Sequence, residues 1–289
     1  MASMIELIKE LRDRTGAGMM DCKRALEASD EDVEKAIDWL RQKGIAKAQA
    51  KASRIAAEGL ASVKVEGNKA VILEINCETD FVSKGEKFHK LVDDVVAVTL
   101  KEQPACINCA REATKSLFTD ATVSMGEKLD YRRFELVEKK AEEGFGAYIH
   151  MGGKIAVLVK LAKEDAELAK GLAMHIAANA PKFVSEADIP AEAMAHEKAI
   201  QVELMKQDEK LANKPADMLD QIANRKVQKV LSESTLSAQV YLLDGEKSVG
   251  QVLKEKGNSV VSFIRYAVGE GIEKRQDNFA EEVMKEANK

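Results

Sequence analysis

Residues 58–75, EGLASVKVEGNKAVILEI, and residues 143–160, EGFGAYIHMGGKIAVLVK, decide the fold, because the second stretch repeats the first. At the shift that takes 58 to 143, both stretches begin with Glu-Gly, and Gly67 and Lys69 match Gly152 and Lys154. Each stretch is a pair of apolar, β-prone runs joined at Gly67-Asn68 or at Gly152-Gly153. Such junctions are typical of hairpin turns. The repeat therefore predicts two related β-hairpins.

An amphipathic helix is expected after each hairpin. The apolar positions are Phe88, Leu91, Val92, Val95 and Val96 after the first, and Leu168, Leu172, Ala173 and Ile176 after the second. A hairpin has to cover one apolar face, and the helix that follows it is the natural cover. The sequence thus predicts an α+β fold with antiparallel sheets, in which residues 58–140 form a first core subdomain and residues 141–245 a second.

Helical segments flank this core. Residues 1–45 predict a three-helix domain, with a Ser3/Glu6 capping box, a break at Gly16 and an end at Gly44. Residues 46–57 read as a helical linker, and residues 190–231 as an antiparallel helical hairpin inserted in the second subdomain, with Ile200 and Leu204 facing 218–222. Residues 246–289 are expected to return a strand and end in a C-terminal module. A short extended segment at 239–242 is expected before them.

Composition narrows the class of function. The 289 residues include 32% charged and 45% hydrophobic residues, and no apolar run approaches the length of a membrane span. The formal net charge of -5 disfavours a general nucleic-acid binder, which needs a basic surface. Four irregularly spaced cysteines and an amphipathic start without a signal-peptide pattern favour the cytoplasm. A protein partner is the expected ligand, with no direct contact to nucleic acid or membrane.

Enzyme signatures are missing from the sequence. It contains no Gly-x-x-x-x-Gly-Lys-Ser/Thr, His-Glu-x-x-His or Gly-x-Ser-x-Gly segment. Cys106 and Cys109 form one Cys-x-x-Cys pair, but a structural zinc site needs further ligands, and a thioredoxin-like site needs the pair directly after a central strand. We expect no catalytic residue, no cofactor and no metal, with a thiol oxidoreductase as a minor alternative.

The segment Thr79-Asp80-Phe81-Val82 follows the second β run of the first hairpin and has no counterpart in the second copy. Two interpretations are open from the residues alone. Thr79 or Asp80 could cap the next helix while Phe81 packs inward as a hydrophobic staple. Alternatively, the aromatic and its neighbouring carboxylate form a working tip for a partner.

Four ordered motifs carry a family resemblance. They are 11–23 (LRDRTGAGMMDCK), 74–82 (EINCETDFV), 174–178 (MHIAA) with Pro181, and 263–273 with Phe-Ile-Arg-Tyr and Val-Gly-Glu-Gly-Ile-Glu. Over nearly its full length, the chain resembles the bacterial elongation factor Ts family, the guanine-nucleotide exchange factors of elongation factor Tu. The resemblance implies a ubiquitin-associated-like N-terminal domain, a two-part core, a coiled-coil hairpin and a C-terminal module.

The resemblance also implies roles for particular residues. In the family, the tip wedges beside the Mg²⁺ and phosphate-binding elements of the GTPase, which assigns Asp80 and Phe81, with Thr79 and Val82, to the exchange wedge. Further partner contacts are then expected at Leu11, Arg12, Met19, Met20, Lys23, His150 and Phe279. The chain departs from the family pattern at Cys106/Cys109, at 224–227 and at 130–133.

A GTPase-binding scaffold without exchange activity is the main alternative function. Dimerisation of the chain through the helical hairpin is a further expectation, and it competes with packing of the same apolar residues inside the hairpin.

Overall fold

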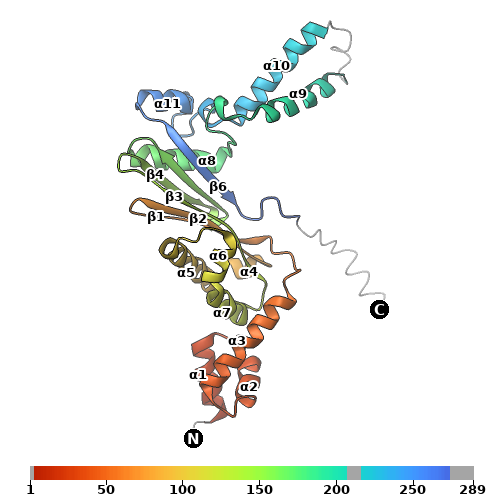
Figure 1. The fold of residues 1–289 in the computed structure, drawn as a ribbon, viewed down its shortest axis with the longest axis vertical. Helices are drawn as coiled ribbons and strands as arrows, with labels where there is room; N and C mark the ends of the chain where they lie inside the picture. The colour runs from red at the N-terminus through yellow and green to blue at the C-terminus, as the bar shows by residue number, and fades with distance from the viewer. Residues whose placement is uncertain (1–2, 207–215, 274–289) are drawn as a thin grey trace.

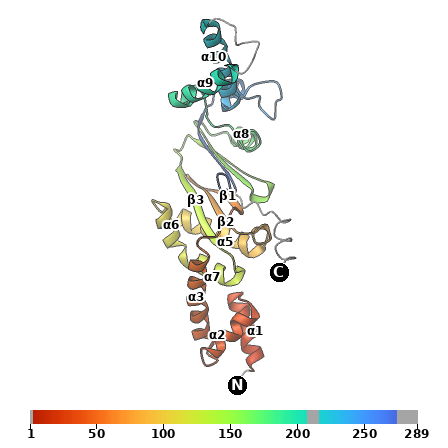
Figure 2. The ribbon, with the colours of Figure 1, turned by 90° about the vertical axis from the view of Figure 1, so that its right-hand side faces the viewer.

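The computed structural model describes residues 3–206 and 216–273, and shows an elongated α+β molecule. Three helices form one end, two three-stranded antiparallel sheets form the centre, and a helical hairpin forms the other end (Figure 1, Figure 2). This arrangement confirms the predicted fold class.

The N-terminal helices are α1 (Met4–Thr15), α2 (Met19–Glu27) and α3 (Val33–Ala50). The predicted capping box is present, since Ser3 and Glu6 bond to each other's backbone N–H groups, and Gly16 ends α1 in the left-handed region. The prediction that Gly44 ends the third helix is wrong, because α3 runs on to Ala50. A Cβ at Gly44 would lie 2.5 Å from the Val123 side chain, so this glycine allows close packing between helices instead.

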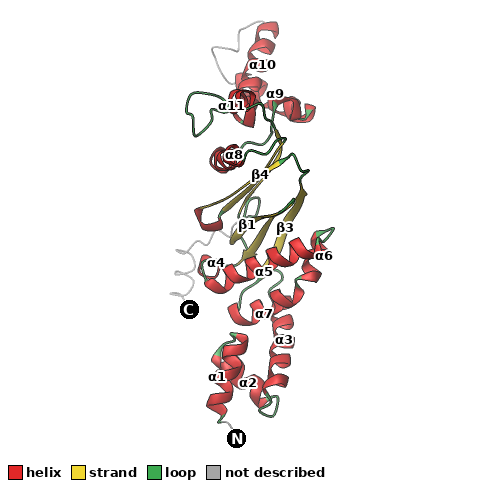
Figure 3. Cartoon of the chain, turned by 90° about the vertical axis from the view of Figure 1, so that its left-hand side faces the viewer, coloured by secondary structure: helices red, strands yellow, loops and turns green. Residues whose placement is uncertain are grey.

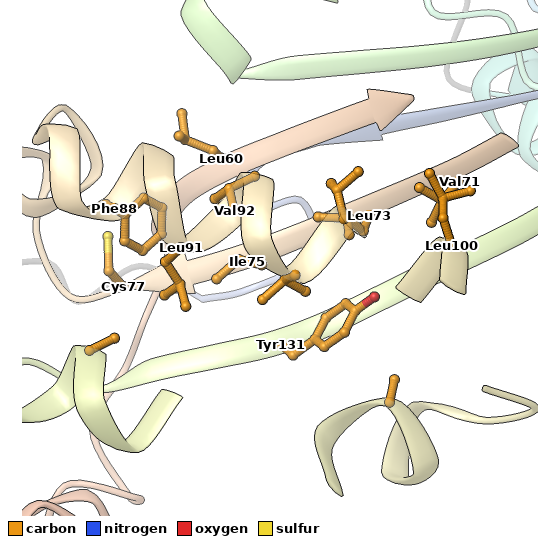
Figure 4. Close-up of a cluster of buried hydrophobic side chains, with 14 residues drawn as sticks. Leu60, Val71, Leu73, Ile75, Cys77, Phe88, Leu91, Val92, Leu100 and Tyr131 are labelled. Atoms are coloured by element: carbon orange, nitrogen blue, oxygen red, sulfur yellow. The ribbon is translucent and has the colours of Figure 1, made fainter. Parts of the chain in front are cut away.

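The first half of the core consists of the hairpin β1 (Glu58–Glu66) and β2 (Lys69–Cys77), with a third strand beside β2. One face of this sheet is covered by helices, and their shared core is built around Leu73, Phe88 and Tyr131 (Figure 4). The remaining elements of this half are α4 (Asp80–Ser83), α5 (Glu86–Glu102), α6 (Ile107–Ala113), α7 (Lys115–Met125) and β3 (Leu129–Glu138). β3 was not among the predicted strands.

The second half repeats this plan. A hairpin of β4 (Gly144–His150) and β5 (Ile155–Leu161) is followed by α8 (Ala166–Asn179), and β6 (Val260–Ala267) is the third strand. A 3-10 turn, η1 (Met151–Gly153), joins the two hairpin strands. The predicted apolar face of α8 is buried against the sheet, with Leu172, Ala173 and Ile176 completely inaccessible. Both predicted hairpins and their covering helices are therefore confirmed.

The hairpins share one register but turn opposite faces to their covering helices. Glu66 pairs with Lys69 across a two-residue turn, whereas the second ladder ends one pair earlier, with His150 opposite Ile155 across a four-residue turn. Matched residues keep matched partners, since His150 and Ile155 correspond to Val65 and Ala70, which also pair. The facing nevertheless differs: Val71 faces the helices, while Ala156, its match in sequence, faces the other sheet.

The two sheets pack face to face, with α5, α6 and α7 outside one sheet and α8 outside the other (Figure 3). Ile72 of β2 and Leu158 of β5 lie in the apolar layer between the sheets. This second buried face explains why nearly every residue of β2 is buried.

A buried carboxylate ties the halves together. Glu74 is completely inaccessible and bonds to Arg132 at 2.9 Å, to Arg133 at 2.6 Å, and to the N–H of Gly269, beyond β6, at 2.8 Å. Consecutive strand residues normally point to opposite faces, but a β-bulge opposite Glu74 lets both arginines reach it. Burial opposes ionisation, yet the Gly269 N–H and the two guanidinium groups lower the pKa of Glu74 overall.

The helical hairpin consists of α9 (Ala191–Lys206) and α10 (Ala216–Glu233). As predicted, it begins directly after Pro190. The predicted facing residues Ile200 and Leu204 are largely exposed, and Met205, Ala223 and Val227 are buried instead. The segment 239–242 is also not a strand of a sheet, since only an isolated bridge joins Val240 to Ser248. The other elements here are η2 (Glu186–Asp188), η3 (Leu236–Ala238) and α11 (Val249–Glu255).

Candidate functional site: an exposed aromatic tip

The tip is the short helix α4, where the chain leaves β2 before it enters α5. Thr79 caps α4, because its side-chain oxygen accepts the N–H of Val82 at 3.4 Å. Ser83 is buried and donates its hydroxyl to the carbonyl of Asp80. The predicted cap at Thr79 is therefore confirmed.

Phe81 and Val82 divide the tip into an outer and an inner face. Phe81 is 86% exposed, whereas Val82 packs against the core formed by β1, β2 and α5. The alternative in which Phe81 packs inward as a staple is therefore wrong. An exposed phenylalanine on a segment anchored from below is available to a partner, and its burial there would be favourable.

Asp80 carries the negative charge beside this ring. Its carboxylate lies 2.7 Å from the Lys84 ammonium, and this hydrogen bond is the main reason why the pKa of Asp80 lies below its usual value. The carboxylate is thus ionised at neutral pH. An opposite charge from a partner could exchange with Lys84 because the pair is open to solvent.

Two glutamates support the tip from below, and sequence reasoning did not single out either of them as a site residue. Glu127, between α7 and β3, accepts the N–H groups of Glu78 and Thr79 at 3.0 Å each and the Thr79 hydroxyl at 2.6 Å. Glu78 in turn accepts the Lys128 N–H at 2.6 Å and a guanidinium N–H of Arg54 at 3.0 Å. Burial disfavours the Glu78 anion, but the Lys128 and Arg54 bonds lower its pKa overall. No sequence pattern links residues so far apart.

Most of the other predicted partner contacts lie on accessible surface. Arg12 and Lys23 are exposed, and Met19 and Met20 at the start of α2 are 59% and 62% exposed. Leu11 differs, because it is completely buried in the core of the N-terminal domain. The prediction that Leu11 itself contacts a partner therefore does not fit the structure.

Two further predicted contacts lie away from α4 in the sequence. His150 ends β4, is partly buried and lies 3.2 Å from the Tyr148 hydroxyl. Phe279 falls outside the described residues.

The N-terminal domain contacts the first core half close to the tip. The Lys87 ammonium donates to the Gly16 carbonyl at 3.2 Å, which brings the turn before α2 to the start of α5.

The cysteine pair lies elsewhere. Cys106 and Cys109 are free and exposed at the start of α6, and the Cys106 sulfur accepts the Cys109 N–H. Hydrogen bonding from Cys109 lowers the pKa of Cys106. The pair follows helix α5 instead of a central strand, so the context of a thioredoxin-like site is not met. Within residues 3–206 and 216–273, no cluster of three potential metal ligands occurs, and no helix could span a membrane.

Together, the helical domain, the paired sheets and the exposed tip define an α+β protein with a duplicated core and, as far as residues 3–206 and 216–273 show, without a helix that could span a membrane. Comparison with known proteins identifies the family. The family model described as Elongation factor TS matches residues 78–270. Elongation factor Ts of Lactiplantibacillus plantarum is 44% identical over 283 residues, covering 96% of each chain. Elongation factor Ts of Pediococcus pentosaceus is 45% identical over 287 residues, covering 97% of each. The chain belongs to the elongation factor Ts family of translation elongation factors.

Proposed function

We propose that this chain binds elongation factor Tu in its GDP-bound form and promotes GDP release, so that GTP can load during protein synthesis. In this proposal the Asp80-Phe81 tip wedges beside the Mg²⁺ and phosphate-binding elements of the GTPase. The observation that carries the proposal is the 86% exposure of Phe81 on a helix whose neighbour Val82 is anchored in the core. The cytoplasm, where elongation takes place, is the proposed location.

Exchange of this kind follows from linkage and requires no covalent step by the chain. A factor that binds the nucleotide-free GTPase more tightly than the GDP-bound form lowers the GDP affinity by the same ratio. Each ten-fold loosening corresponds to about 1.4 kcal/mol of differential binding. Burial of one phenylalanine ring contributes roughly 1.5–3 kcal/mol. A tip that is buried only in the nucleotide-free complex can therefore account for a roughly ten- to hundred-fold faster release.

Release of fluorescent GDP from elongation factor Tu tests the proposal. We expect the chain to accelerate release, and Phe81→Ala to reduce that acceleration by about ten- to hundred-fold, the equivalent of losing the ring's burial. The folded structure should be preserved because the ring is exposed. Leu243→Ala is the matched control, since Leu243 is a large exposed apolar residue, 60% accessible, in the second half of the core. Equal release rates for Phe81→Ala and the parent would exclude the wedge.

A scaffold that binds the GTPase without exchange remains the alternative. It predicts that the chain forms a complex with elongation factor Tu but leaves the GDP release rate unchanged. The release assay therefore separates the two functions, provided that complex formation is measured in parallel.

Dimerisation through the helical hairpin stays a separate proposal. It is supported by exposed apolar side chains along the hairpin, namely Met194, Ile200, Leu204 and Met218. Sedimentation of the chain alone, over a range of concentrations, distinguishes a monomer from a dimer.

A further inference from the structure

We infer that Glu127 is a positioning residue for the exchange tip: its carboxylate fixes the backbone from which α4 projects Phe81. The inference rests on the proposed function for its consequence in GDP release, but its structural part stands on hydrogen bonds within this chain. Within the proposed wedge, Glu127 is hydrogen-bonded to Thr79. It is therefore argued to act through the tip, and not on the partner.

Glu127 satisfies three donors at the base of the tip. One carboxylate oxygen accepts the N–H groups of Glu78 and Thr79, and the other accepts the Thr79 hydroxyl. Hydrogen bonds to an ionised acceptor are stronger than neutral ones. The Thr79 hydroxyl oxygen also accepts the N–H of Val82, so Glu127 is bonded directly to the cap of α4. Loss of Glu127 would leave two backbone donors and the capping hydroxyl without this acceptor.

The contact is reciprocal, which makes the geometry specific. While Glu127 accepts N–H groups from the 78–79 segment, Glu78 accepts the N–H of Lys128. Two chain segments, one after β2 and one before β3, are thus joined by carboxylates that bond to each other's backbone. A helix of four residues cannot hold its own direction, because a single turn is marginal in water. The direction of α4 has to be imposed by such outside contacts and by Val82.

The other side of the same turn holds the linker that leads to the N-terminal domain. The Lys128 ammonium donates to the carbonyls of Ala52 and Arg54 at 2.8 Å each, and the Lys51 ammonium donates to the Gly126 carbonyl. Adjacent residues of one turn therefore serve two structures: Glu127 holds the tip with its side chain, and Lys128 holds the linker. This division provides matched variants at neighbouring positions.

Amide hydrogen exchange of the full chain, without any partner, tests the structural part. In Glu127→Ala, the amides of Glu78 and Thr79 should exchange at least about ten-fold faster, because they lose a charged acceptor. Lys128→Ala keeps the backbone N–H that bonds to Glu78, so it should leave these two amides near their parent rates. Thermal unfolding of both variants identifies any general loss of structure. Unchanged exchange at Glu78 and Thr79 in Glu127→Ala would overturn the inference.

The functional part is tested by GDP release from elongation factor Tu as the concentration of the chain is varied. A loosened tip should lower the maximal release rate by about ten-fold while the half-saturating concentration changes little, because the other contact surfaces are intact. Thr79→Val, which removes only the hydroxyl, should lower the maximal rate less, and the double variant should lose less than the product of the two effects. Glu86→Ala removes an exposed carboxylate near the tip and controls for charge.

The outcomes separate this inference from the function on which it depends. If Phe81→Ala lowers GDP release and Glu127→Ala does not, the positioning role is wrong although the proposed function holds. If neither variant affects release, the proposed function fails, and the role of Glu127 in exchange fails with it. In that case amide exchange still decides whether Glu127 orders the tip.

Discussion

The two halves of the core have the same arrangement of elements but differ in the segment that joins the second hairpin strand to the covering helix. Each has a hairpin, a covering helix and a third strand beside the second hairpin strand. In the second half the chain passes from β5 to α8 through four residues, 162–165, and Asp165 caps the helix directly. In the first half eight residues, 78–85, separate β2 from α5 and form the capped, exposed tip. The duplicated plan thus supplies a scaffold, and the feature proposed for exchange lies where the copies differ.

The third strands differ in how they are reached. β3 follows β2 after the tip helix α4 and three helices that cover the first sheet, whereas β6 returns only after α8, the α9–α10 hairpin and α11. The second half therefore contains the long helical segment between its second and third strands, and the first half contains the tip. Both sheets depend on each other, because each contributes one face to the apolar layer between them.

The largest effect is expected from breaking the connection between the halves at Glu74. Glu74→Ala removes the shared acceptor of Arg132, Arg133 and the Gly269 N–H, so that a buried N–H and two partly buried guanidinium groups lose this carboxylate. We expect a loss of about 3–5 kcal/mol in the free energy of unfolding, as for other broken buried ion pairs. Urea unfolding at neutral pH measures it.

A control separates this loss from a general effect of removing a carboxylate. Glu66→Ala, at the exposed end of β1, should change stability by no more than about 0.5 kcal/mol. Similar losses for Glu74→Ala and Glu66→Ala would mean that the buried cluster does not hold the halves together.

A smaller loss of stability should reveal how closely α8 packs against its sheet. A Cβ at Gly146 would lie 2.3 Å from the Ala169 carbonyl oxygen, so Gly146→Ala forces α8 away from β4. The matched residue in the first copy is Ala61, which faces the other sheet and has room for its methyl group. We expect Gly146→Ala to lower stability by about 1–3 kcal/mol, the usual range for overpacking.

Gly18→Ala controls for the substitution itself, since the only atom near a Cβ at Gly18 is 3.9 Å away. Its cost, measured by the same urea titration, should be a few tenths of a kcal/mol, as for a changed N-cap. If Gly146→Ala were equally mild, the different facing of the matched residues would have no energetic consequence.

Much of this fold can be predicted from the sequence, but particular parts of it cannot. The repeat predicts both hairpins and helices because turn residues and apolar spacing are local signals. β3 escapes because its sequence, LDYRRFELVE, is highly charged, and its arginines find their partners on distant segments, at Glu74 and beyond β6. The opposite facing of the two copies escapes because matched residues keep the same register, and the face that each helix covers depends on tertiary packing.

Prediction of the tip from the sequence has a similar limit. Thr79 is a recognisable cap, yet the same pattern fits Phe81 as a buried staple or as an exposed ring. The choice depends on tertiary packing, which here places Val82 in the core. Glu127 is invisible in the sequence for the same reason, since its bonds to Glu78 and Thr79 cross about fifty positions.

The smallest expected effect concerns the turn of the second hairpin. Met151 adopts a φ of 51°, in the left-handed region, within the four-residue turn between β4 and β5, and its side chain is 69% exposed. Met151→Gly relieves about 1 kcal/mol of backbone strain but adds a similar entropy to the unfolded chain. The net change in unfolding free energy should therefore stay within about 0.5 kcal/mol in urea titrations. A loss above about 1 kcal/mol would mean that the Met151 side chain, and not the backbone conformation alone, stabilises the turn of the second hairpin.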